Sequence, residues 1–97
     1  MSANIVLDHK FRQMEGTVCC DIDGETVVLH SKNCKYFNLG VIGGDIWTLL
    51  EKDISVRQLV QAIESEYDVE SRECELKVIS FLGQLVDEQL IQIVDNQ

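Results

Sequence analysis

Residues 33–50, with the sequence NCKYFNLGVIGGDIWTLL, change their hydrophobic period part-way and thereby indicate the fold class. Polar and apolar residues alternate over Lys35–Leu39, which is typical of a half-buried strand. From Ile42 onward the apolar residues recur at three- and four-residue spacing, which is typical of a helix, and Trp47 is the single tryptophan of the chain. The sequence therefore predicts a strand that runs directly into a very hydrophobic helix.

The residues before this stretch have the pattern of a β-hairpin. Two runs rich in β-branched residues, 17–22 and 26–30, flank the dipeptide Asp23-Gly24. Asp-Gly between two such runs is a strong hairpin signal, because both residues tolerate the positive φ angles of a two-residue turn. Together with Lys35–Leu39, we expect three consecutive antiparallel strands.

The two ends of the chain are less regular. Residues 1–14 mix charged and apolar side chains without a period, so we expect an irregular N-terminal arm. Residues 15–97 are expected to form one domain, since a chain of 97 residues builds a single modest core. The segment 90–94, LIQIV, alternates weakly and is consistent with a closing strand or a wing.

Two further helices are expected after the first. Ser55 and Gln58 have the spacing of a capping box, in which each side chain bonds to the backbone N–H of the other residue. They predict the start of a second helix. Ser71 is a candidate cap for a third, longer helix that runs to about residue 88.

The third helix has two apolar faces. At about 100° per residue, the first face is the natural core stripe and consists of Cys74, Val78, Phe81, Leu82 and Leu85. The second face lies on another side of the helix and consists of Leu76, Ile79, Ser80 and Gly83. An exposed helix face normally carries charge, whereas these residues are apolar or small, so a backbone can approach them closely. We therefore expect the second face to be one wall of a groove.

The charge balance argues against nucleic acid as a ligand. The chain has 8 Lys and Arg residues against 17 Asp and Glu residues, so its net charge is −9. Nucleic-acid affinity rests largely on basic side chains that neutralise phosphates. We expect no nucleic-acid partner and favour a basic or neutral polypeptide. No apolar run approaches the roughly 18 residues of a membrane span, so no membrane partner is expected.

Cofactors and metals are not expected. The four cysteines include no C-x-x-C pair and the start of the chain lacks the apolar core of a secretory signal, so we predict a cytoplasmic protein with reduced thiols. His30 and Cys34 are the single close His–Cys pair, and no other candidate ligands have a matching spacing. No catalytic triad order, phosphate-binding glycine loop or pair of catalytic carboxylates stands out, which indicates a protein without catalytic residues.

Three segments of the sequence resemble one known family. KYFNLGVIGGDIWTLLE, SVRQLVQAIESEYDVE and CELKVISFLGQLVDEQLI occur in this order and are similar to the PqqD-like family, especially the stand-alone leader-recognition proteins of lasso-peptide pathways. The resemblance covers about residues 17–94. It implies an α+β fold in which a three-stranded antiparallel sheet packs on three helices in a winged helix-turn-helix-like arrangement.

The resemblance also implies a function. Family members are not enzymes; they bind the leader segment of a ribosomally synthesised precursor peptide and hold it for a leader peptidase and a cyclase. In the family the leader adds as a strand to the third strand and packs against the last helix. Carried over to this sequence, the peptide-binding residues are Lys35, Tyr36, Phe37, Asn38, Leu39, Leu76, Ile79, Ser80 and Gly83. The chain departs from the family at Lys77, where many relatives carry Asp, and at Gln89, where a Gly usually ends the helix.

Two other functions stay open at the level of the sequence. The second and third predicted helices are compatible with a winged-helix DNA-binding regulator, although the last helix has more acidic than basic residues. The chain is also compatible with a structural subunit that stabilises a larger enzyme. We expect a monomer or a weak dimer, because an unpaired third strand can pair between protomers.

Overall fold

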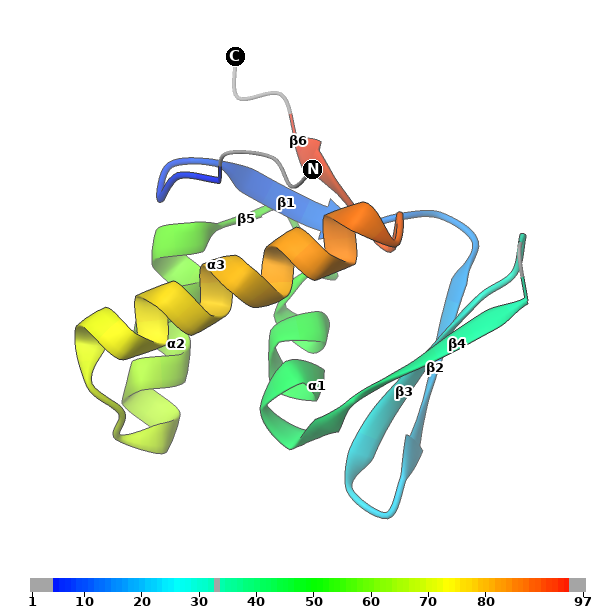
Figure 1. Cartoon of the computed structure of the whole chain (residues 1–97), viewed down its shortest axis with the longest axis horizontal. Coiled ribbons are helices and arrows are strands. Elements are labelled where there is room, and N and C mark those ends of the chain that lie inside the picture. Colours follow the sequence, from blue (N-terminus) through cyan, green and yellow to red (C-terminus); the bar gives the residue numbers. More distant parts are fainter. Residues whose placement is uncertain (1–4, 33, 95–97) are drawn as a thin grey trace.

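The computed structural model describes residues 5–32 and 34–94, and in these ranges it has three helices and six strands. The elements follow the chain in the order β1 (Lys10–Gln13), β2 (Thr17–Ile22), β3 (Glu25–His30), β4 (Lys35–Leu39), α1 (Gly40–Leu49), β5 (Ile54–Ser55), α2 (Val56–Tyr67), α3 (Ser71–Asp87) and β6 (Ile91–Val94). Figure 1 shows the three helices packed together, with the long hairpin sheet projecting from them. The predicted α+β class is confirmed. Within the described ranges, no helix is both long enough and apolar enough to span a bilayer.

The predicted three-stranded sheet is confirmed. β2, β3 and β4 form an antiparallel sheet in that order, and the first hairpin closes on the pair Ile22 and Glu25. Asp23 and Gly24 have positive φ angles of 55° and 83°, as a two-residue type I′ turn requires. β3 is therefore the central strand of this sheet, and β4 is an edge strand.

A second antiparallel sheet has the strand order β5–β1–β6. The expectation of an irregular lead-in is wrong for Lys10–Gln13, because these residues pair with β6 along the whole strand and with β5 at their start. Phe11 is only 2% exposed and belongs to the core. Both partner strands come from distant parts of the chain, so no local period reveals β1. The weakly alternating segment 90–94 contains β6, the closing strand of this second sheet, and residues 1–4 of the predicted arm lie outside the described residues.

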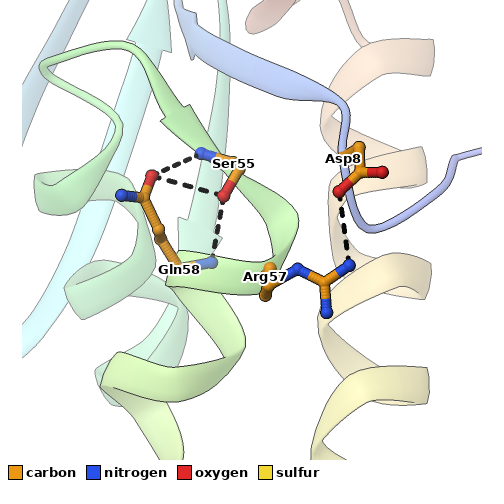
Figure 2. A network of polar contacts seen from close by, with 4 residues as sticks. All are labelled: Asp8, Ser55, Arg57 and Gln58. Carbon is orange, nitrogen blue, oxygen red and sulfur yellow. Dashed lines mark hydrogen bonds and ion pairs between the residues drawn. The ribbon is translucent and has the colours of Figure 1, made fainter.

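The predicted capping box at the start of α2 is confirmed. Figure 2 shows that Ser55 Oγ accepts a hydrogen bond from Gln58 N at 3.1 Å, and that Gln58 Oε1 accepts one from Ser55 N at 3.1 Å. An N-cap of this kind stabilises a helix by about 1 kcal/mol. In the same view Arg57 and Asp8 form an ion pair at 3.2 Å, which ties the N-terminal segment to the first turn of α2.

The helix α3 lies across α1 and α2 (Figure 1) and completes the core. It begins at Ser71 with Glu70 as its N-cap, so the prediction that Ser71 caps this helix is wrong by one residue. Core residues come from all three helices, from both sheets and from the adjoining loops: Phe11, Val28, Ile46, Trp47, Leu50, Val56, Leu59, Val60, Ile63, Cys74, Val78, Leu82, Leu85, Leu90 and Ile91. Val28 comes from β3, so the hairpin sheet meets the helices through its central strand.

Candidate functional site

β4 has one unpaired edge. Its antiparallel pairing with β3 includes Phe37 opposite Val28 and Tyr36 opposite Leu29. On its other side, no strand of the described ranges pairs with it. An edge strand leaves alternate backbone N–H and C=O groups without a partner in the ladder.

The hairpin turn determines which backbone groups of β4 point to this free edge. A two-residue turn closes on a hydrogen-bonded pair, and hydrogen-bonded pairs then alternate along the ladder. By this alternation the even-numbered residues of β3 form their backbone hydrogen bonds with β4. The backbone N–H and C=O groups of Val28 and of the opposite Phe37 therefore point toward each other. Tyr36 and Asn38 therefore direct their N–H and C=O groups to the free edge.

A cavity of about 590 Å³ lies between this edge and the last turns of α3; it is called the β4–α3 groove below. It is lined by Tyr36, Phe37, Asn38 and Leu39 of β4, by Phe81, Gln84, Leu85 and Asp87 of α3, by Glu88, the C-cap of α3, and by Leu90. In Figure 1 the orange C-terminal end of α3 lies on the side of the molecule from which β4 projects. The unpaired strand edge thus borders a cavity whose lining combines the buried Leu85 and Leu90 with exposed polar side chains.

Four of the five predicted residues of β4 line the groove, and Lys35 does not. The predicted alternation of the strand is confirmed, because Phe37 and Leu39 are half-buried whereas Tyr36 and Asn38 are exposed. Tyr36 is 74% exposed, so most of its ring is accessible to a ligand.

The structure does not bring the four predicted residues of α3 to this groove. None of Leu76, Ile79, Ser80 and Gly83 lines the cavity. Leu76 is 59% exposed and Ser80 is also exposed, whereas Ile79 is half-buried and Gly83 is buried. Their role in peptide binding stays a prediction.

The face of α3 that lines the groove differs from the predicted one. This face consists of Phe81, Gln84, Leu85 and Glu88, which follow the i, i+3, i+4, i+7 spacing of one helix side. Phe81 and Leu85 were expected in the core; Leu85 is buried, but Phe81 is only half-buried. Gln84 and Glu88 are polar, so a search for an unexplained apolar face passes over them. In the sequence, these two polar residues beside the core stripe were the only indication of this face, and any solvated helix has polar residues in such positions.

The side chain of Asn38 forms two hydrogen bonds at the junction between β4 and α1. Its Nδ2 donates a hydrogen bond to Glu25 Oε1 at 2.9 Å, and its Oδ1 accepts one from the backbone N–H of Gly40 at 2.9 Å. Gly40 has a φ angle of +77°, which glycine adopts without steric cost. These bonds fix the end of the strand edge relative to the first turn of α1.

The groove is negatively charged near the C-terminus of α3. Asp87 and Glu88 line this end, and in the described part of the chain neither takes part in an ion pair. The last turn of α3 has no basic residue, and the C-terminus of a helix carries the negative end of the helix dipole. This end of the groove therefore favours a positively charged or N–H-donating group.

No arrangement for binding a metal is found among the residues that the structure describes, where no three His, Cys, Asp or Glu side chains form a suitable group. His30 is buried and its Nδ1 accepts a hydrogen bond from Lys32 N at 3.2 Å, whereas Cys34 is exposed.

Burial raises the pKa of the Cys74 thiol, and the charge of Glu64 raises it further. The Cys74 thiol is therefore neutral at physiological pH.

The chain matches one known protein family. The model of the family described as coenzyme PQQ synthesis protein D (PqqD) matches residues 25–91. The chain belongs to the PqqD family. The matched PqqD region runs from β3 to the start of β6 and so includes both sides of the β4–α3 groove. No curated protein sequence is significantly similar to the chain.

Solved structures share the PqqD fold of this chain. TbiB1, solved in complex with the TbiA(beta) leader peptide, is 32% identical with a TM-score of 0.78, and the match covers 88% of this chain and 99% of TbiB1. A lasso peptide synthetase B1 complexed with its leader peptide is 22% identical with a TM-score of 0.75, covering 84% of this chain and 96% of that one. The PqqD part of Methylobacterium extorquens PqqCD, a stand-alone recognition element for ribosomally synthesised and modified peptides (RiPPs), is 16% identical with a TM-score of 0.78, covering 92% and 95%. The last two likenesses show the fold alone.

Proposed function

We propose that this PqqD-family chain is a non-catalytic adaptor that binds the leader segment of a ribosomally synthesised precursor peptide by strand addition. The observation that carries the proposal is the unpaired edge of β4 beside the β4–α3 groove. The leader peptide in the TbiB1 complex supports this class of ligand, since TbiB1 is 32% identical to the chain.

Strand addition satisfies the free groups of β4. Folded proteins usually protect an exposed strand edge, because its unpaired N–H and C=O groups invite pairing with another chain. A guest strand would bond to the backbone of Tyr36 and Asn38, and this pairing demands little of the guest sequence. Alternate guest side chains would enter the groove toward Phe81 and Leu85, and these contacts would provide specificity.

The charge of the groove adds a second preference. Asp87 and Glu88 are accompanied by the negative end of the α3 dipole, so a Lys or Arg of the leader is favoured at this end. The net charge of −9 also speeds the approach of a basic peptide at low salt. The leader that we propose therefore pairs apolar anchors with a basic residue.

The same proposal gives the chain no reaction of its own. The lining of the groove contains no Ser, Thr, Cys, His or Lys side chain, so it offers none of the usual pairs of nucleophile and base. We propose that the chain presents the leader to a leader peptidase and a cyclase, which act on the precursor while its leader is held on β4.

The test first searches the genes beside that of this chain for a short precursor peptide, and then titrates the isotope-labelled chain with its synthetic leader. We expect a Kd of about 1 µM or lower, which corresponds to a binding free energy of about −8 kcal/mol or more negative. Amide shifts should concentrate on Lys35–Leu39 and on the second half of α3. A scrambled peptide of equal composition is the control and should bind at least about tenfold more weakly.

Two results would contradict the proposal in different ways. Amide shifts confined to residues 17–30 would show that the leader binds elsewhere than β4. Equal affinity for the leader and the scrambled peptide, or binding of neither, would exclude the adaptor function itself.

A further inference from the structure

A second cavity, of about 330 Å³, lies on the helical side of the molecule. It is formed by α1, the end of α2 and the first half of α3, and its walls include Ile42, Ile46, Ile63 and Val78. Ile42 is 43% exposed, so the mouth of the cavity opens to solvent. An apolar hollow that opens to solvent is characteristic of a binding site.

Phe81 joins the second cavity to the β4–α3 groove. Its side chain lines both cavities and is half-buried. Gly43, in the first turn of α1, makes room for the ring, because a Cβ at this position would lie 2.9 Å from Phe81 Cζ. The two cavities therefore meet at one aromatic side chain that lies against the backbone of α1.

The course of β4 leads a bound strand toward the second cavity. β4 ends at Leu39, so a peptide that pairs with β4 leaves the sheet where α1 begins. Ile42, which lines the second cavity, lies one helical turn further along the chain. On α3, Gln84 lines the groove and Lys77 lines the second cavity, and the helix between them rises by about 10 Å. An extended peptide covers that length with about three residues.

The rim of the second cavity indicates which side chain fits. Lys77 and Glu73 line the rim and form an exposed ion pair at 3.4 Å, so their charges already compensate each other. Inside, Cys74 contributes a neutral thiol. A charged guest side chain would lose its hydration there without gaining a partner. The cavity therefore suits an aliphatic or aromatic side chain.

We propose that the second cavity is an anchor site for one aliphatic or aromatic side chain of the bound peptide, about three residues beyond the segment that pairs with β4. This inference rests on the proposed function. It adds that recognition uses two separate sites, the strand edge and the helical cavity, which meet at Phe81.

The test compares Ile42→Ala with Val41→Ala in the full chain. Both side chains are aliphatic and exposed in the first turn of α1, Val41 at 55%, but of the two only Ile42 lines the second cavity. By calorimetry with the synthetic leader, we expect Ile42→Ala to weaken binding about tenfold and Val41→Ala less than about twofold. Thermal unfolding of both variants should stay close to that of the wild type.

An alanine scan of the leader then identifies the anchor residue. At this residue the losses from the leader change and from Ile42→Ala should not add, because both changes remove the same contact. If Ile42→Ala binds as well as Val41→Ala, or if the losses add at every apolar leader position, the second anchor site is wrong while strand addition stands. If the wild-type chain does not bind the leader, both proposals are wrong.

Discussion

The hydroxyl of Tyr67, at the end of α2, donates a hydrogen bond to Oδ2 of Asp45 in α1. This bond joins two of the helices that form the second cavity. It is also the main reason that the pKa of Tyr67 rises to about 12; burial and the negative charges of Asp45 and Glu66 act in the same direction.

Stability at alkaline pH should depend on this bond. The pKa of Tyr67 is 10.0 in its ordinary state and about 12 in the fold, so folding favours the protonated phenol. The stabilising contribution is complete below pH 10.0 and is lost as the pH rises to about 12. We expect the Tm of the wild type to fall more steeply over this range than that of Tyr67→Phe, as followed by circular dichroism. Parallel curves would contradict a stabilising role for the bond.

Gly44→Ala should destabilise the fold although alanine favours helices. A Cβ at Gly44 would lie 2.8 Å from Thr26 Cβ, which sits close to the backbone of the central strand β3 and cannot move alone. We expect a loss of about 1–3 kcal/mol in urea unfolding. Gly43→Ala is the comparison: its Cβ would lie 2.9 Å from Phe81 Cζ, at the tip of a flexible side chain, and 3.1 Å from Leu39 Cβ, so we expect a smaller loss there. If Gly44→Ala were as stable as the wild type, α1 and β3 would be packed less tightly than the approach of Gly44 to Thr26 indicates.

Strand addition can be tested by a backbone change at the free edge. Tyr36→Pro and Tyr36→Ala both remove the side chain, but only proline also removes the N–H that points away from β3. We expect Tyr36→Pro to bind the leader about tenfold more weakly than Tyr36→Ala. Both variants should unfold at similar temperatures, since this N–H has no partner in the ladder. Equal affinities would argue that the leader does not pair with β4.

The two candidate faces of α3 predict opposite results. Phe81 lines the groove, whereas Leu76 belongs to the face selected from the sequence and does not line it. We expect Phe81→Ala to weaken leader binding about tenfold and Leu76→Ala less than about twofold, measured by calorimetry. If Leu76→Ala weakened leader binding more than Phe81→Ala, the leader would bind to the face formed by Leu76, Ile79, Ser80 and Gly83.

Local elements could be predicted because their signals lie within a few residues of one another. Asp23-Gly24 sets a turn through the φ angles that it tolerates, and Ser55 and Gln58 cap a helix through mutual bonds. β1 could not be predicted in this way. Phe11 becomes part of a strand only because β5 and β6 arrive beside it from distant positions, and a single sequence carries no record of that pairing.

The sequence by itself determined the strand Lys35–Leu39, its alternating faces and, through the family resemblance, its edge as the expected peptide site. Only the tertiary structure decided which face of α3 meets that edge. The rotation of a helix about its own axis is set by packing against its neighbours: Phe81 lies on Gly43 of α1, which brings Gln84 and Glu88 to the groove. Gly83, expected to open the groove, is buried, because helical periodicity shows which residues share a face but not what each face meets.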